Sequence, residues 1–181
     1  QVMQPTFGQN LMFMFQHQIG TMYMRYFMWN FAGRESDEQG ADWLSPVGAS
    51  KDVPEALATN KGRNNFFMIP FVLGLIGMFY QFVKDTKNFS VVALLFVMLG
   101  VAIVLYLNSP PTEPRERDYI YAGSYYAYAF WIGLAVIGLY ELLISFIKNG
   151  RVAAIAASLL GLTAPAIMAA EGWDDHNRSN R

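Results

Sequence analysis

The chain contains no cysteine. Disulfide bonds, cysteine-ligated zinc, haem attached through cysteine and thiol catalysis are therefore excluded, although this absence does not identify the compartment. The sequence also lacks a phosphate-binding P-loop, a nucleophile elbow and an HExxH zinc motif. Nothing in it indicates the active site of a soluble enzyme.

Charge is scarce as well. Of 181 residues, 15% are charged and 54% are hydrophobic, whereas an average soluble domain has about 25% charged residues. The net charge of −1 and the lack of a lysine or arginine cluster predict no nucleic-acid partner. The charges lie in a few short stretches separated by long uncharged runs, which is typical of an integral membrane protein.

The uncharged runs predict an all-α membrane protein with four transmembrane helices in the region 66–170. The expected spans are 66–83, 89–107, 121–147 and 152–170. At ~1.5 Å per residue the first would be slightly short for a bilayer of ordinary thickness. The fourth is rich in alanine and glycine, so we expect it to pack inside the bundle.

The segment 1–32 precedes the spans and contains an apolar stretch, 11–31, that includes His17 and Arg25. It is compatible with an interfacial helix, with a buried helix of a larger bundle, or with a further span whose polar residues need interior partners. We favour the interfacial helix. A polar loop, 33–65, follows and carries six acidic residues.

The loops predict an orientation. The two shortest turns carry Lys84, Lys87, Lys148 and Arg151, and the positive-inside rule places them in the cytoplasm. The loop 33–65, the proline-rich connection 108–118 and the tail 171–181 then share the outer face. These three segments hold 12 of the 14 acidic residues. The chain starts at Gln1 and ends in a polar stretch, so we expect it to be an internal fragment of a longer polypeptide.

The densest polar cluster is Pro114-Arg-Glu-Arg-Asp-Tyr119, close to the expected membrane surface. Its arginines suit bidentate contacts with phosphate or carboxylate. The cluster is therefore either a site for a lipid-linked phosphate or phosphosugar, or an ion-pair network that holds the loop on the bundle.

Three further candidates are weaker. Asp174, Asp175 and His176 match a divalent-metal or general-base site, or else a solvated junction to a following domain. The stretch Gly33-Arg-Glu-Ser-Asp-Glu38 matches an acidic site or a capped helix start. Glu141, inside the third span, is either functional or ion-paired near Lys148.

Three strings carry a family resemblance: Arg25-Tyr-Phe-Met-Trp-Asn-Phe-Ala-Gly-Arg34, Ser109-Pro-Pro-Thr-Glu-Pro-Arg-Glu-Arg-Asp-Tyr119 and Gly172-Trp-Asp-Asp-His-Asn-Arg178. With them, nearly the whole chain resembles a family of large bacterial inner-membrane proteins known by a domain of unknown function. That family is similar to the transmembrane protein O-mannosyltransferases of the GT-C glycosyltransferase class. The resemblance implies a GT-C-like helical bundle and a soluble domain after Arg181.

The implied activity is transfer of a mannose-like sugar from a polyprenyl-phosphate donor to serine or threonine of a protein acceptor, on the periplasmic face of the bacterial inner membrane. The catalytic acidic residue of such enzymes lies in an earlier loop, so no catalytic residue is assigned here. Within this chain we expect Arg115, Arg117 and Arg34 to bind the donor phosphate, with Glu116, Asp118 and Tyr119 orienting them.

No protein-bound cofactor is expected, and the need for a divalent metal stays open. Two other classes compete with the enzyme: a non-catalytic membrane scaffold or assembly subunit, and a transporter or channel. The last is the weakest, because Glu141 is the single ionisable residue within the four predicted spans other than their ends.

Overall fold

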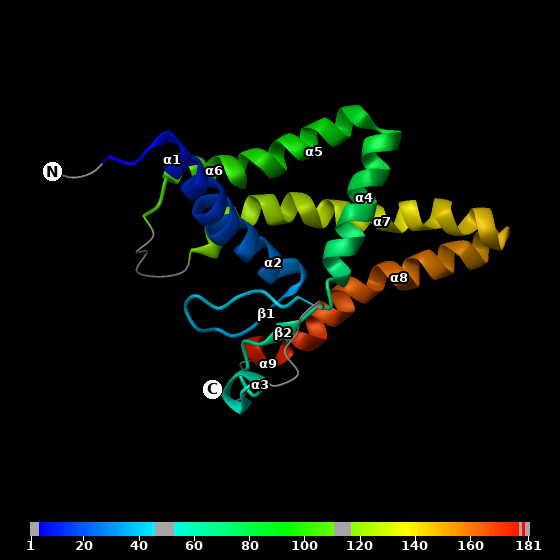
Figure 1. Ribbon diagram of the computed structural model, residues 1–181. Helices are drawn as coiled ribbons and strands as arrows, with labels where there is room; N and C mark the ends of the chain where they lie inside the picture. The colour runs from blue at the N-terminus through cyan, green and yellow to red at the C-terminus, as the bar shows by residue number, and fades with distance from the viewer. Residues whose placement is uncertain (1–3, 46–52, 111–116, 178, 180–181) are drawn as a thin grey trace.

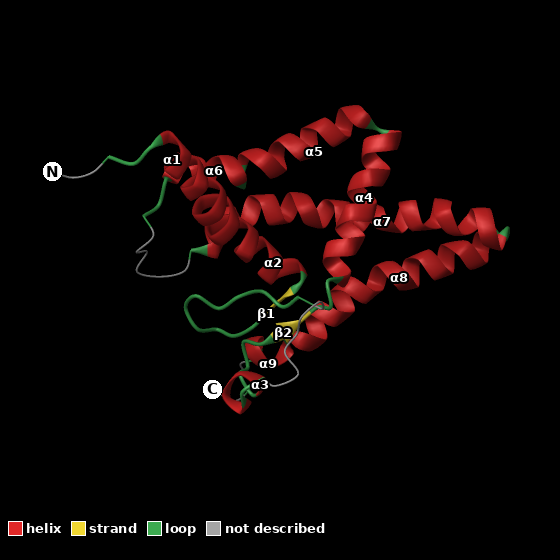
Figure 2. Cartoon of the chain, viewed as in Figure 1, coloured by secondary structure: helices red, strands yellow, loops and turns green. Residues whose placement is uncertain are grey.

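The computed structural model describes residues 4–45, 53–110, 117–177 and 179. The chain is mostly helical, as predicted (Figure 1 and Figure 2). Three helical stretches are long and apolar enough to cross a membrane: Thr86–Leu107, Asp118–Ile147 and Gly150–Glu171. They correspond to the second, third and fourth predicted spans.

The elements follow one another along the chain as named in Figure 1. In order they are α1 (Phe7–Phe13), the π-helical η1 (Met14–Met24), α2 (Arg25–Phe31), β1 (Gly33–Arg34), α3 (Glu55–Ala58), β2 (Asn64–Asn65), α4 (Ile69–Lys84), α5 (Thr86–Met98), α6 (Val101–Leu107), the 3-10 helix η2 (Asp118–Tyr121), α7 (Ala122–Ile147), α8 (Gly150–Glu171) and α9 (Trp173–His176).

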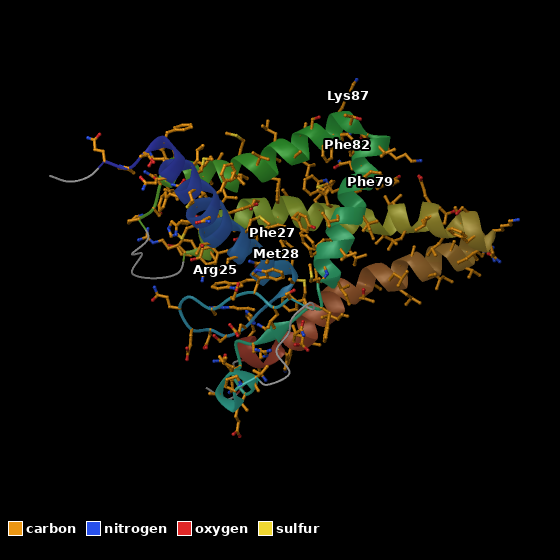
Figure 3. The ribbon with its side chains drawn as sticks, viewed as in Figure 1. Arg25, Phe27, Met28, Phe79, Phe82 and Lys87 are labelled. Atoms are coloured by element: carbon orange, nitrogen blue, oxygen red, sulfur yellow. The ribbon has the colours of Figure 1, made fainter. Side chains whose placement is uncertain are left out.

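The N-terminal helix runs through α1, η1 and α2 and supplies much of the core. Five of the seven residues of α2 are buried, among them Phe27 and Trp29. The Phe27 ring contacts the rings of Phe96 and Tyr128, with centroids 5.7 Å and 4.8 Å away, and Figure 3 shows Phe27 just below α7. Residues 11–31 are helical, and burial is concentrated in α2, whereas Met12 and Phe15 are 58% and 59% exposed; which of the three alternatives holds, and where this helix lies relative to a membrane, stays a prediction.

Helix α4 packs closely on α7. The backbone carbonyl of Trp131 lies so near Gly77 that an added Cβ would overlap it, and a Cβ added at Gly74 would likewise overlap the Tyr128 ring. A buried hydrogen bond joins the same helices, because Trp131 Nε1 donates to Gln81 Oε1 at 2.7 Å. Helix α4 has 16 residues, which is shorter than the three span candidates.

The second predicted span is interrupted. Helix α5 ends at Met98, and α6 begins at Val101 after a break at Leu99 and Gly100. The ring of Tyr23 lies against the Gly100 backbone, where a Cβ would approach the Tyr23 hydroxyl oxygen to 2.5 Å. Glycine therefore permits this close approach, and the helix breaks where η1 crosses it.

Both short turns lie away from the strands. In Figure 1 the α4–α5 turn is at the top, above the middle of α7, and the α7–α8 turn is at the far right, whereas β1, β2 and α9 are at the lower left. Lys87 projects outward at the α4–α5 turn (Figure 3). The alternation of four spans across a membrane stays a prediction.

The loop 33–65 is closed by a short antiparallel ladder in which Gly33 pairs with Asn65 and Arg34 with Asn64. Gly33 has a φ of +131° and lies against Asn64, so a side chain is excluded there. A wholly helical chain was predicted, and two-residue strands are too short to leave an alternating pattern in sequence. The helix start expected near Ser36 and Asp37 does not form, since residues 35–45 adopt turns and bends.

Candidate functional site

A pocket of about 530 Å³ lies at the end of the bundle away from the two short turns. We call it the polar pocket. It draws residues from α2, both strands, the start of η2, the end of α8 and α9: Trp29, Asn30, Arg34, Asn64, Phe66, Asp118, Met168, Ala169, Gly172, Trp173 and His176. Segments far apart in the sequence therefore meet at one site.

Arg34 is fixed at this pocket by the backbone around it. It pairs with Asn64 in the ladder and forms a bridge to Trp43 on its other side. Its guanidinium carbon lies 4.2 Å from the centroid of the Trp29 ring, a cation–π contact that holds the charge over a buried indole. In the described part of the chain Arg34 forms no salt bridge with Asp118, although both line the pocket.

The C-terminal end of α8 is tied to the ladder beside the pocket. Glu171 Oε2 accepts a hydrogen bond from the Asn65 backbone N–H at 3.0 Å. Asn65 Oδ1 in turn accepts from the Phe67 N–H at 3.0 Å. Phe67 and Met68 both have positive φ, 52° and 55°, so the chain turns sharply into α4 at a conformational cost.

Three hydrogen-bonding atoms in the pocket wall have no partner among the residues that the structure describes: Trp29 Nε1, Arg34 Nε and Asn64 Oδ1. Trp29 is only 5% exposed. Each buried polar atom left unsatisfied destabilises a protein by about 1–3 kcal/mol. All three atoms are closed to solvent, so they lie behind the pocket surface rather than on it.

A second, apolar pocket of about 520 Å³ adjoins the polar one between α7 and α8. We call it the apolar pocket; its lining includes Phe31, Ile132, Val136, Leu162, Pro165 and Met168. Met168 lines both pockets, and Phe31 follows Asn30 of the polar pocket in the chain. A polar chamber thus opens beside an apolar surface that runs along two of the span candidates.

The structure brings together three of the predicted site residues, since Arg34, Asp118 and His176 all line the polar pocket. Tyr119 is 60% exposed and Arg117 is half-buried; neither is among the residues that line the pocket. Arg115 and Glu116 lie outside the described residues. The roles predicted for all of these residues stay predictions.

The metal prediction is not tested, because the side chains of Asp174 and Asp175 are outside the described part. His176 Nδ1 lies 2.9 Å from the Gly172 carbonyl oxygen. Among the residues searched, no group of three or more acidic or histidine side chains could hold a metal ion.

Glu141 forms a different ion pair from the one suggested by sequence. Its carboxylate lies 2.6 Å from Lys84 Nζ on α4, rather than pairing with Lys148, and it accepts a hydrogen bond from Tyr80 at 3.2 Å. Lys84 belongs to the neighbouring helix α4. Spacing in the sequence does not show which residues of two helices lie opposite each other, so this pair was not predicted. An interhelical tie near the end of the bundle accounts for this carboxylate.

Sequence analysis missed Trp29, Asn64 and the two aromatic residues Phe66 and Trp173. The signal in the sequence was their position near the expected outer surface. Asn64 and Asn65 come just before an apolar run, and Trp29 lies one helical turn before Gly33.

A comparison of the chain with family models, curated proteins and solved structures finds no match.

Proposed function

We propose that the chain is the membrane-embedded part of a glycosyltransferase that moves a mannose-like sugar from a polyprenyl-phosphate donor to serine or threonine of a protein acceptor. One observation carries the proposal: a polar pocket containing an arginine adjoins an apolar pocket along two helices suited to a membrane. A lipid-linked phosphate needs both surfaces next to each other.

Each surface has a defined part in this proposal. The apolar pocket receives the first isoprene units, because burying apolar surface is favourable there. Arg34 contacts the phosphate, for which its planar guanidinium is suited. Arg115 and Arg117 complete the phosphate site, and Glu116, Asp118 and Tyr119 orient them. The general base that activates the acceptor hydroxyl belongs to another part of the polypeptide.

The proposed membrane arrangement has four spans in a GT-C-like bundle. Helix α4 with the residues before it forms the first span, because its 16 residues already extend for ~24 Å. The turns with Lys84, Lys87, Lys148 and Arg151 face the cytoplasm. The polar pocket, at the opposite end, then opens to the periplasm of a bacterial inner membrane.

The test is Arg34→Ala in the intact protein, assayed for sugar transfer from polyprenyl-phosphate mannose in membranes. Loss of a charged hydrogen bond of about 1.5–3 kcal/mol predicts a roughly 10- to 150-fold lower kcat/KM. Arg63→Ala is the matched control, because Arg63 lies in the same loop but not among the pocket residues. Equal activity of Arg34→Ala and Arg63→Ala would refute the phosphate role.

The same assay separates the enzyme from a scaffold. An intact protein that binds the donor lipid but transfers no sugar to any serine- or threonine-containing acceptor would favour the non-catalytic alternative. A protein that binds neither polyprenyl phosphate nor its glycosylated form contradicts the proposed function itself.

A further inference from the structure

A third pocket, of about 450 Å³, lies between α4, α5 and α7 beside the α4–α5 turn. We call it the turn pocket. Its lining includes the charged and polar residues Lys84, Asp85 and Asn88 and the apolar residues Val91 and Phe130. It shares no lining residue with the polar pocket, and in Figure 1 the α4–α5 turn is on the opposite side of α7 from the strands. The turn pocket is therefore a separate feature of the molecule.

The charged groups of the turn pocket are open to a ligand. The side chain of Lys84 is 53% exposed, and its ammonium has three donors, so the ion pair with Glu141 leaves donors for another acceptor. Asp85 is exposed and forms no salt bridge within the described residues. Its carboxylate is held in place by Asn88, because Oδ1 accepts from the Asn88 backbone N–H at 3.2 Å and Oδ2 accepts from the Asn88 side-chain amide.

The local charge does not favour a ligand that is only anionic. Lys84 is one cation between two carboxylates, those of Asp85 and Glu141, and Lys87 projects outward from the turn (Figure 3). The negative end of α4 and the positive end of α5 meet at this turn and offset each other. A ligand that carries both a positive and a negative group fits this arrangement better than an anion does.

We propose that the turn pocket binds the headgroup of phosphatidylethanolamine, with the phosphate at Lys84 and the ammonium at Asp85 and the Asn88 amide oxygen. Only two carbons separate the two charges of this headgroup, which suits opposite charges on consecutive residues. The acyl chains cover Val91 and Phe130, which are 58% and 50% exposed. This inference rests on the proposed membrane arrangement and is independent of the sugar donor.

The experiment measures binding of four dioleoyl phospholipids to the intact, delipidated protein in detergent by native mass spectrometry. Their headgroups are ethanolamine, N-methylethanolamine, choline and glycerol. We expect affinity to fall at each N-methylation, because N–H donors to the carboxylate are lost. The ethanolamine lipid should bind about fivefold more tightly than the choline lipid, the size of an exposed ion pair. The glycerol lipid, which is anionic, should bind no more tightly than the choline lipid.

Asp85→Asn removes the charge but keeps a residue that caps helices well. It should lower the affinity for the ethanolamine lipid to that for the choline lipid. Asp42→Asn is the matched control, because Asp42 is also exposed and also accepts a backbone N–H, that of Trp43, but lies outside the turn pocket. It should change no affinity.

Each other outcome overturns the inference. Equal affinity for all four lipids shows contact with lipid but no headgroup site. Tightest binding of the glycerol lipid shows a basic site instead of one for a zwitterion. An undiminished preference in Asp85→Asn shows that the carboxylate does not select the headgroup. The comparison of lipids on the wild-type protein needs no variant, so it stands even if Asp85→Asn does not fold. None of these results bears on the binding of polyprenyl phosphate, which tests the proposed function.

Discussion

The hydrogen bond between Trp131 and Gln81 is a buried polar contact between α4 and α7, with exposed fractions of 1% and 6%. Gln81→Met keeps the side-chain volume but leaves the indole N–H without its acceptor. We expect the free energy of unfolding to fall by roughly 1 kcal/mol, the size of interhelical hydrogen bonds in membrane proteins. Denaturant unfolding in detergent micelles, followed by tryptophan fluorescence, measures the loss.

The matched control is Gln16→Met, because Gln16 is exposed and a surface change of this kind lies within about 0.5 kcal/mol. The double variant with Trp131→Phe should lose less than the sum of the two single losses. Equal stability of Gln81→Met and Gln16→Met would show that this contact contributes nothing.

Phe67 combines a left-handed backbone, φ 52°, with a side chain that is 58% exposed. Phe67→Gly should therefore stabilise the protein by up to about 1 kcal/mol, since glycine adopts this conformation without steric strain. Phe79→Gly is the control, because Phe79 is also largely exposed, at 67%, but lies within α4, and it should destabilise by about 1 kcal/mol. If thermal unfolding temperatures shift in the same direction for both variants, the expected backbone strain at Phe67 is contradicted.

Residue chemistry led to part of the polar pocket from sequence alone. Arg34, Asp118 and His176 stood out because charged groups near apolar runs are unusual, and all three line the pocket. Asn64 and Trp29 did not stand out, because their place at the pocket depends on contacts that only the folded chain reveals.

At the scale of elements, the close approach of α4 and α7 depends on Gly77. Gly77→Ala places a methyl group against the Trp131 carbonyl, so the helices must separate, and overpacking of this kind costs about 1–3 kcal/mol. Gly133→Ala is the matched control on α7, because nothing lies within 4 Å of the added Cβ. Unfolding in micelles should show a loss for Gly77→Ala and no loss, or a small gain, for Gly133→Ala.

The long apolar runs predicted the α7 and α8 helices to within a few residues, because local composition suffices for such elements. The break at Gly100 and the ladder between Gly33 and Asn65 were not predicted. Both depend on a partner distant in the chain, Tyr23 for the break and the other strand for the ladder. No local pattern encodes such a contact.

The whole molecule has two chemically different ends. One carries the lysine-containing turns, and the other gathers the ladder, α9 and the polar pocket. Whether these two ends lie on opposite sides of a membrane stays a prediction, and which end would face the cytoplasm depends on the positive-inside rule alone. Orientation is therefore a separate question from the arrangement of the helices.

The absence of cysteine makes the orientation directly testable, because each introduced cysteine is the only one in the chain. Lys87→Cys and Arg151→Cys are placed at the two short turns, and Thr59→Cys in the loop beside α3; all three positions are exposed. In intact cells a membrane-impermeant maleimide should label Thr59→Cys alone, and the turn positions only after permeabilisation. Labelling of both turns in intact cells would invert the orientation while keeping the fold. Labelling of one turn but not the other would contradict the arrangement of spans. It would then also contradict the proposal that the polar and apolar pockets form one site at a single membrane surface.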